Sequence, residues 1–230
     1  PSQRPQADVT FIAPALDAAA TRGELWTRLL NAVCWEAGRF GIQQVFASLP
    51  ADSKEALPFL NAGFVIYARE ELFGCEGNHS DGNSPRETRL RPQRPADLFA
   101  LQRLCAAIMP IGVKQMEGAF EPNGSPAARA GALHAGGGES FVLEAGGEIV
   151  GHVELVRGNI GHRIDFALHP EAAQLAGELV SAGLGLLRGD RGLPIYTHVR
   201  TYEHFLKPAL LGHGFQALDQ RDLLVRHTLV

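Results

Sequence analysis

The sequence is poor in cysteine and has no long apolar segment. Three cysteines, Cys34, Cys75 and Cys105, are scattered along 230 residues, and none belongs to a C-x-x-C pair. An odd, scattered set is typical of a reducing compartment, and it favours neither a disulfide framework nor a structural zinc site. No apolar run approaches the roughly 20 residues that a membrane-spanning helix needs. We therefore expect a cytoplasmic protein without a membrane partner.

Positive charge is also scarce. Lys and Arg number 21 against 25 Asp and Glu, which gives a net charge of −4. Because nucleic-acid binding needs a concentrated basic surface, we expect no nucleic acid as a partner. Nine histidines are present, but none are spaced as H-x-x-x-H or H-E-x-x-H, so we expect no metal. The 45% apolar and 20% charged residues are ordinary for a globular protein.

One pattern occurs twice in the chain. RGELWTRLLNAV at 22–33 and AGELVSAGLGLL at 176–187 both carry Gly-Glu-Leu and continue as apolar-rich helices. Each is followed by a Gly-Phe pair, at 63–64 and at 214–215. Around these landmarks the periodicity predicts strand, helix, strand, short helix and strand, over 8–73 and again over 162–229. Residues 88–161, in front of the second copy, predict a strand, helices and a hairpin that turns at Gly146-Gly147.

A segment without apolar periodicity separates the two copies. GCEGNHSDGNSPRE at 74–87 is rich in turn-forming residues and is interpreted as a linker. We therefore predict a partial domain over 1–74, a linker over 75–87 and a complete domain over 88–230. The expected fold class is α/β, with a mixed, mostly antiparallel sheet flanked by helices in each of two domains related by an approximate rotation.

The order of elements resembles the GNAT superfamily of acyl-CoA-dependent N-acyltransferases. The most specific features are a strand ending in LHP at 168–170, a glycine-bearing helix after it and GHGF at 212–215. The resemblance covers 88–230 and, as a back half only, 8–73. It implies acyl transfer by direct attack, with acetyl-CoA or another acyl-CoA as co-substrate. The acceptor would be a small-molecule amine or an amine of a protein or peptide. An oligomer is compatible with the sequence, which does not indicate its order.

The resemblance also implies a cofactor site in the second domain. In such enzymes the strand before the glycine-bearing helix splays from its neighbour, and the pantetheine arm pairs with the exposed backbone. Here that strand would leave free the backbone donors of Ala167, Leu168 and His169. The pyrophosphate would lie at the helix N-terminus, on a loop of the form Q/R-x-x-G-x-G/A. The stretch QLAGEL matches this loop at Gln174 and Gly177.

Both phosphate loops depart from the family pattern. Leu179 stands in the last place of the second loop, and ATRGEL in the first domain keeps Gly23 but has Ala20 in the Gln/Arg place. Glu178 and its counterpart Glu24 would repel a pyrophosphate unless they point away from it. A second explanation is that the two glycines only pack a helix against a strand.

Three residues are candidates for catalysis. The family often has a tyrosine as general acid four residues before the glycine of Gly-Phe, but Leu210 and Phe59 stand there. Tyr202, where a strand passes into a helix, is the predicted substitute, with an ordinary packed tyrosine as the other interpretation. The resemblance implies a carboxylate base on the central strands, for which Glu154 and Asp165 are the candidates.

The strand pattern leaves the environment of these acids open. Alternation puts Asp165 on the face opposite Ile164 and Phe166, and burial there would raise its pKa. The other interpretation puts both acids on a solvated sheet face. His169 and His198 are further candidates for accepting a proton, with satisfied surface histidines as the other interpretation.

Two classes of function fit these observations. The first is an N-acyltransferase in which the first domain does not turn over substrate. The alternative is a non-catalytic GNAT-fold module that binds a small ligand or a partner. Likeness of fold alone does not decide between them.

Overall fold

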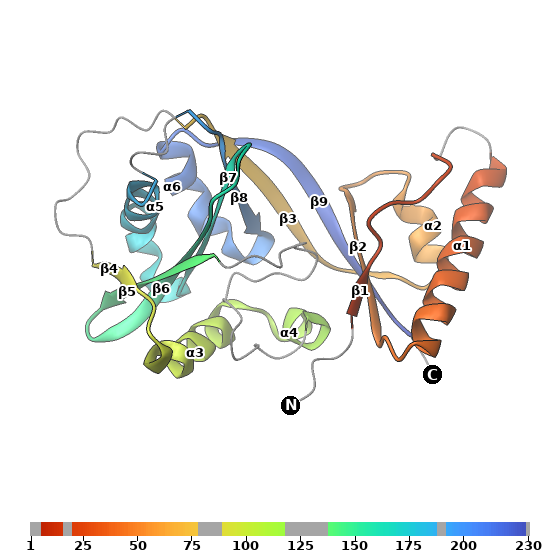
Figure 1. The fold of residues 1–230 in the computed structure, drawn as a ribbon, viewed down its shortest axis with the longest axis horizontal. Helices are drawn as coiled ribbons and strands as arrows, with labels where there is room; N and C mark the ends of the chain where they lie inside the picture. The colour runs from red at the N-terminus through yellow and green to blue at the C-terminus, as the bar shows by residue number, and fades with distance from the viewer. Residues whose placement is uncertain (1–5, 16–19, 78–88, 118–137, 188–191, 229–230) are drawn as a thin grey trace.

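A computed structural model of the chain describes residues 6–15, 20–77, 89–117, 138–187 and 192–228. These residues form a nine-stranded sheet in the order β1-β2-β9-β3-β8-β7-β6-β5-β4. The pairs β1–β2 and β7–β8 are parallel, and the other neighbours are antiparallel. Helices cover the sheet, which confirms the predicted fold class (Figure 1). Within the described residues, no helix is long and apolar enough to cross a membrane.

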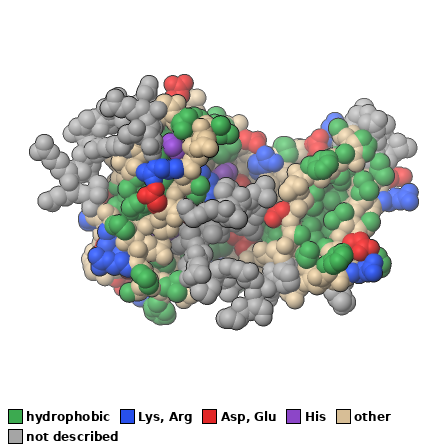
Figure 2. Space-filling model, in the orientation of Figure 1, with side chains coloured by type: hydrophobic (Ala, Val, Ile, Leu, Met, Phe, Trp, Pro, Cys, Tyr) green, Lys and Arg blue, Asp and Glu red, His purple; other side chains and the backbone are tan. Residues whose placement is uncertain are grey.

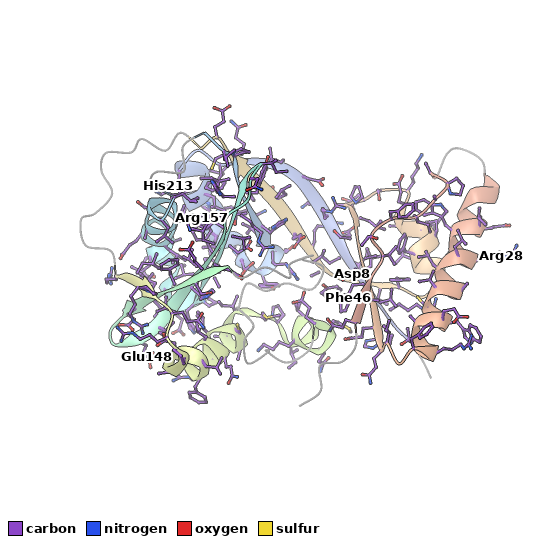
Figure 3. The ribbon with its side chains drawn as sticks, viewed as in Figure 1. Asp8, Arg28, Phe46, Glu148, Arg157 and His213 are labelled. Carbon is purple, nitrogen blue, oxygen red and sulfur yellow. The ribbon has the colours of Figure 1, made fainter. Side chains whose placement is uncertain are left out.

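The first copy consists of two helices on a short stretch of sheet. Its elements are β1 (Gln6–Asp8), α1 (Ala20–Arg39), β2 (Gln44–Pro50), α2 (Ala56–Asn61) and β3 (Val65–Cys75). Trp26 and Leu30 of α1 lie on one helix face and pack with Val45 of β2 and Phe59 of α2. β1 is an edge strand of the sheet, and its Asp8 is the ladder partner of Phe46 on β2 (Figure 3). The exposed side of α1 carries large apolar side chains beside polar ones, and green side chains gather over this part of the molecule in Figure 2.

The described residues from 89 to 228 form the larger part of the molecule. Its strands are β4 (Leu90–Pro92), β5 (Glu139–Ala145), β6 (Glu148–Val156), β7 (His162–Leu168), β8 (Ile195–Arg200) and β9 (Gln216–His227). Its α-helices are α3 (Leu98–Ile108), α4 (Ile111–Glu117), α5 (Ala176–Gly185) and α6 (Lys207–Gly212). Three 3₁₀ turns, η1 (Pro95–Asp97), η2 (Pro170–Leu175) and η3 (Thr201–Leu206), precede α3, α5 and α6.

Several sequence predictions hold in this part. The hairpin of β5 and β6 turns at Gly146 and Gly147, both of which have positive φ. The second Gly-Glu-Leu segment is the helix α5, and a 3₁₀ turn with non-helical Ala172 precedes it. The strand predicted after Gly214-Phe215 is one long strand, β9. Its length lets it reach the far end of the molecule.

The strands β3 and β9 run through both parts of the molecule (Figure 1). β3 lies between β9 and β8, and β9 lies between β2 and β3. The last strand of each copy is therefore inserted into the sheet of the other copy. The sequence predicted a separate sheet for each domain, and the structure corrects this to one shared sheet. Hydrophobic periodicity sets which face a strand buries but does not name its neighbours, so the exchange was invisible in the sequence.

The arrangement of strands is the same on both sides of the β9–β3 pair. On one side, β1 and β2 are parallel, and β2 and β9 are antiparallel. On the other side, β7 and β8 are likewise parallel, and β8 and β3 are antiparallel. Gly63 and Gly214 both have positive φ, at 82° and 85°, and each precedes an exchanged strand. Tyr67 and Leu218 are the residues skipped at two register shifts between β3 and β9. Gly63 and Tyr67 have the same spacing along the chain as Gly214 and Leu218, and this correspondence fits the predicted relation of the two copies by an approximate rotation.

The division into 1–74, 75–87 and 88–230 remains a proposal. β3 continues to Cys75, one residue into the predicted linker. Most of that linker, residues 78–87, lies outside the described residues. The exchange of β3 and β9 also means that any division of the chain at this point cuts across a shared sheet.

Candidate active site

The parallel ladder between β7 and β8 is short. It joins His162 to Ile195 and Arg163 to Tyr196, and the N–H of His162 donates to the carbonyl of Pro194 at 2.8 Å. From Ile164 to Leu168 the described backbone has no ladder partner on β8. The strands therefore part toward their carboxyl ends, as the sequence predicted. An extended ligand can pair with backbone groups that such a gap exposes.

The backbone donors at the end of β7 are divided between its two neighbours. The N–H of His169 donates to the carbonyl of Val150 on the β6 side at 2.8 Å. The prediction that this amide is free is therefore wrong. Because amides alternate in direction along a strand, the N–H of Ala167 also points to β6 and that of Leu168 points toward β8. Of the three predicted donors, Leu168 is the one that faces the gap.

The N-terminus of α5 follows this gap after the η2 turn. The Nδ1 atom of His169 accepts the N–H of Glu171 at 3.2 Å and so caps the turn. Gln174 and Gly177 are both exposed here. A Cβ atom built at Gly177 would meet nothing within 4 Å, whereas one at Gly183 would lie 2.6 Å from Phe166 Cε1. Close packing therefore explains Gly183 but not Gly177, and phosphate contact at Gln174 and Gly177 stays a prediction.

The charge of Glu178 is compensated. Its carboxylate accepts hydrogen bonds from Arg89, from Nε to Oε1 at 3.0 Å and from Nη2 to Oε2 at 2.5 Å. Arg89 lies directly before β4. The repulsion that the sequence predicted between Glu178 and an anion is consequently reduced.

Glu154 and Asp165 are cross-strand partners on β6 and β7. Asp165 is 2% exposed, so the interpretation that both acids lie on a solvated face is wrong for it. Its Oδ2 lies 2.9 Å from Arg163 Nε, and its Oδ1 lies 3.8 Å from His198 Nδ1. Ile164 and Phe166 pack on the other side, in the core with α5, as alternation predicted. The sheet face toward α3 thus holds two adjacent carboxylates.

His152 lies on the same strand as Glu154 and is fully buried. Burial lowers the pKa of its imidazole to about 4, against an opposing effect of Asp165. The side chain is therefore neutral at neutral pH. His198, by contrast, is part-exposed at the edge of this polar group.

Tyr202 and Ala167 line one small cavity, which we call the inner cavity. Its other lining residues include Cys105 and Ile108 of α3, Glu117 of α4 and Glu203 of η3. The structure thus brings the predicted acid beside the predicted pantetheine track. Glu154 and Asp165 do not belong to this lining. Leu210 and Phe59, in the tyrosine place of the family, are buried core residues.

Sequence reasoning missed a polar cluster at the end of α4. Oε1 of Glu117 accepts hydrogen bonds from Arg200 Nη1 at 2.7 Å and from the Tyr67 hydroxyl at 3.0 Å. Arg200 is 0% exposed, and its Nε lies 3.2 Å from Oε2 of Glu70. Burial opposes the charge of Arg200, but its neighbours, Glu117 first, keep the pKa of its guanidinium raised. Burial and then Glu117 raise the pKa of the Tyr67 hydroxyl.

These residues come from elements far apart in the chain, so spacing could not group them. The one available signal was Arg200 itself, a charged residue at the end of a strand that has no other Asp, Glu, Lys or Arg. A buried strand seldom carries an unpaired guanidinium, so Arg200 predicts acidic partners elsewhere. Within the described ranges, no three His, Cys, Asp or Glu side chains are grouped so that they could hold a metal ion.

Comparison with known proteins identifies the fold. No family model and no curated protein sequence matches the chain. A functionally unknown conserved protein from Staphylococcus epidermidis superposes with a TM-score of 0.62 and 15% identity, covering 90% of this chain and 81% of that one. A tandem GNAT protein from the clavulanic acid biosynthesis pathway gives a TM-score of 0.57 and 13% identity, covering 100% of this chain and 77% of that one.

A third solved structure is a conserved protein of unknown function from Enterococcus faecalis, described as a probable N-acyltransferase. Its TM-score is 0.52 at 9% identity, and the match covers 87% of this chain but 49% of that one. At sequence identities of 15% or less, the similarity to these three structures shows the fold alone. The chain has the GNAT fold, and its whole length matches a tandem GNAT protein, which confirms the resemblance predicted from the sequence.

Proposed function

We propose that the chain is an N-acyltransferase that moves an acetyl or other acyl group from acyl-CoA to an amine. The observation that carries this proposal is the end of the β7–β8 ladder after Arg163, beside a cavity lined by Ala167 and Tyr202. An opening of this kind suits a pantetheine arm. The cavity at its side has a volume of about 10 Å³, which is room for about one water-sized group. The GNAT fold supports the same class of reaction.

In the proposed reaction the amine nitrogen attacks the thioester carbonyl carbon. A C–N bond forms, the C–S bond breaks, the nitrogen loses a proton, and the departing thiolate gains one. Tyr202, next to Ala167, is the proposed donor of the proton to sulfur. Glu154 and Asp165 are the proposed bases, and they lie outside the cavity lining, so a proton reaches them through intervening groups or water.

The acyl-CoA would be held by two parts of the chain. The N–H of Leu168 faces the gap where the pantetheine arm would lie. Gln174 and Gly177 are exposed before and within the first turn of α5, where free N–H groups favour an anion. The first copy corresponds to the back half of the fold only and has Ala20 in the Gln/Arg place of the phosphate loop, so the proposed turnover belongs to the second copy alone.

The alternative function is a non-catalytic module of the same fold. The observation in its favour is Leu210, which is 0% exposed and fills the family's acid position with packing. In that case the chain would bind a small ligand or a partner protein in the second copy, with the first copy as a platform. Acyl-CoA turnover separates the two functions.

Calorimetric titration with CoA tests the proposed site. The variant Gly177→Asp adds a charge where the pyrophosphate would lie, and loss of two charge-assisted bonds lowers affinity roughly a hundredfold. Glu178→Gln should tighten binding slightly, because it leaves Arg89 without its carboxylate partner. Gly185→Asp is the matched control, since Gly185 also has open space around it but lies at the other end of α5.

Release of free thiol from acetyl-CoA in the presence of amines then tests turnover. CoA binding that Gly177→Asp weakens to the predicted extent, together with thiol release, supports the acyltransferase. Binding without release for any amine supports the module. If wild-type protein does not bind CoA, or if all variants bind equally, the proposed site is wrong.

A further inference from the structure

Helix α1 has a row of apolar side chains that remains part-exposed. Leu25, Leu29 and Val33 recur every four residues, so they lie in one row along the helix. Their exposed fractions are 38%, 37% and 50%, whereas Trp26 and Leu30 on the adjacent face are buried against β2 and α2. We call the three exposed residues the α1 stripe.

The second copy shows what covers the corresponding row there. Aligning the two Gly-Glu-Leu segments matches the α1 stripe with Leu179, Gly183 and Leu187. Leu179 and Leu187 are buried. A Cβ atom built at Gly183 would lie 2.6 Å from Phe166 Cε1 on β7, and one built at Gly151 on β6 would lie 3.3 Å from Leu179 Cδ1. In the second copy this row therefore packs on β7 and β6, and the α1 stripe is the same row without that cover.

The first copy has a counterpart of β7 but none of β6 in the part of the chain that the structure describes. β1 pairs in parallel with β2, as β7 does with β8, and β1 is then the last strand of the described sheet. The N–H of Val9, directly after β1, donates to the carbonyl of Phe46 on β2 at 2.8 Å. Because backbone groups alternate in direction, those of Gln6 and Asp8 point to the open edge. An edge of this kind pairs readily with another strand.

The opposite edge of the sheet is less suited to pairing. Its strand β4 ends at Pro92, which has no N–H to donate. Arg91 of the same strand is held by Asp97, with Nη1 2.7 Å from Oδ2. Proline and charged side chains are features that protect an edge strand. β1 contains no proline, and its Asp8 forms no ion pair with any residue that the structure describes.

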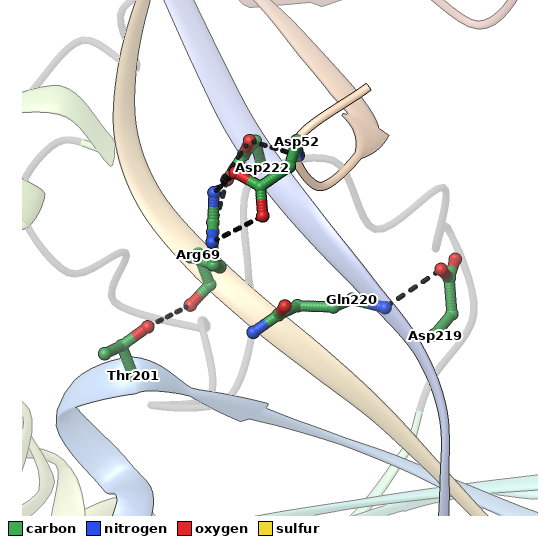
Figure 4. A network of polar contacts seen from close by, with 6 residues as sticks. All are labelled: Asp52, Arg69, Thr201, Asp219, Gln220 and Asp222. Atoms are coloured by element: carbon green, nitrogen blue, oxygen red, sulfur yellow. Dashed lines mark hydrogen bonds and ion pairs between the residues drawn. The ribbon is translucent and has the colours of Figure 1, made fainter. Parts of the chain in front are cut away.

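The strands that carry the open edge are fixed to the rest of the sheet. Arg69 of β3 binds Asp222 of β9, with Nε 2.6 Å from Oδ1, and also Asp52 after β2, with Nη2 2.8 Å from Oδ1 (Figure 4). β2, on which β1 lies, is the neighbour of β9. The surface made by β1 and the α1 stripe is therefore held in place without a partner. A preformed surface loses less conformational entropy on association.

We propose that two molecules of the chain form a dimer about a two-fold axis, with β1 pairing with β1 and the α1 stripes packing against each other. An axis perpendicular to the sheet makes the two strands antiparallel, which is the relation that β6 has to β7. The same axis places both helices on one face of the joined sheet. Each apolar stripe then meets its own copy, as a two-fold interface requires. This interface does not depend on the proposed acyl transfer.

The backbone directions of β1 set the register of the pair. Pairing centred on Ala7 puts Gln6 of one protomer opposite Asp8 of the partner subunit, and these are the residues whose backbone groups point outward. The carboxylate of Asp8 then faces an amide and not a second carboxylate, which would be unfavourable. Ala7 pairs with Val45, which packs with α1, so Ala7 lies on the α1 side of the sheet. Its small side chain leaves room for the two stripes.

Sedimentation equilibrium of the full chain, between about 1 and 100 µM, tests the dimer. We expect the mass of two chains of 24.8 kDa. Leu29→Asp places one carboxylate from each protomer in the apolar contact and should weaken association by at least about a hundredfold. Leu211→Asp is the matched control, because Leu211 of α6 is also exposed but lies outside the interface, and it should leave association unchanged. Circular dichroism of both variants checks that they fold.

A cross-link tests the register even if Leu29→Asp does not fold. Residues opposite each other in a pair without hydrogen bonds have Cα atoms about 4.5 Å apart, within reach of a disulfide. Ala7→Cys should therefore give a covalent dimer on oxidation with copper phenanthroline, seen by non-reducing electrophoresis. The native cysteines are buried. Glu148→Cys is the control, since Glu148 is exposed in the part of the molecule far from Asp8 (Figure 3), and it should stay monomeric.

Three results would overturn the proposal. The first is the mass of a single chain at every concentration. The second is a dimer that Leu29→Asp leaves intact and that Ala7→Cys does not link, because its interface would lie elsewhere. The third is an assembly that grows with concentration beyond two chains, since a two-fold pairing of β1 closes at the dimer. A dimer that Leu29→Asp dissociates and Ala7→Cys links supports the interface, whether or not the protein binds CoA.

Discussion

Tyr67 on β3 donates its hydroxyl hydrogen to Oε1 of Glu117 on α4 at 3.0 Å. The exchanged strand of the first copy is thereby bonded to a carboxylate of the second copy's cavity. Glu117 also accepts from Arg200, so this one oxygen joins β3, α4 and β8. The position of Glu117 in the lining of the inner cavity therefore depends on contacts with both copies.

Replacing Tyr67 by Phe should destabilise the protein. The change removes a buried hydrogen bond to a charged acceptor, which is worth about 2 kcal/mol. Urea unfolding followed by far-UV circular dichroism measures the loss. Tyr196→Phe is the control, because Tyr196 is 36% exposed. Equal stability of Tyr67→Phe and wild type would mean that the bond to Glu117 does not hold α4 to β3.

Stability should rise with pH through the range in which His152 titrates. Burial lowers the pKa of its imidazole from 6.5 to about 4, so the unfolded chain binds more protons between these values. The contribution is complete above pH 6.5 and is lost as the pH falls toward 4, by about 3 kcal/mol in all.

The variant His152→Gln should flatten this dependence between pH 6.5 and 4.5, as measured by urea unfolding at each pH. His204→Gln provides the comparison, since His204 is exposed. A slope that persists in His152→Gln would assign the acid sensitivity to groups other than His152.

Replacing either of two glycines of α5 by alanine should change the stability of the protein, and the two changes should have opposite signs. A Cβ at Gly183 would lie 2.6 Å from Phe166 Cε1 and 2.9 Å from Ile164 Cδ1, so Gly183→Ala should cost about 1–3 kcal/mol through overpacking. Gly177→Ala meets no atom and should gain up to about 1 kcal/mol from helix propensity. Thermal unfolding of both variants distinguishes them. A loss of stability in Gly177→Ala would show that its backbone is strained or packed.

The shared sheet predicts one cooperative unfolding transition for both copies. Phe59 and Leu210 occupy corresponding places before Gly63 and Gly214, and both are buried. Either residue replaced by alanine should cost about 2–5 kcal/mol and lower the midpoint of one calorimetric transition. Two resolved transitions, with each variant moving a different one, would show that the copies unfold separately despite the exchange.

The fold was predictable where local pattern and close neighbours decide it. The Gly-Glu-Leu helix, the β5–β6 hairpin and the Gly-Phe strand starts all follow from periodicity and turn residues. The exchange of β3 and β9 did not follow, because an edge accepts any strand whose buried face and length match. The two positive-φ glycines marked where each strand begins but not which sheet it enters.

The candidate site, like the fold, was predictable only where local sequence pattern decides the position of a residue. Glu154 and Asp165 could be assigned to adjacent central strands, and Tyr202 to the end of β8, because each lies within a recognisable element. Glu117, Arg200 and Tyr67 were missed, since their meeting depends on α4 docking over an exchanged strand. Whether Gly177 packs or binds could not be judged from its spacing; the open space around it removes the packing explanation.

The exchange also sets the order in which the sheet can be completed during synthesis. Val65 of β3 pairs with Val225 of β9, so β3 leaves the ribosome long before its partner exists. At about 5–20 residues per second, that interval lasts on the order of ten to thirty seconds. During it, β2 and β3 have unpaired edges that any other strand can join. Until β9 has been synthesised, these edges can pair with other nascent chains that are translated from the same mRNA. The cell therefore has to protect the edges during synthesis.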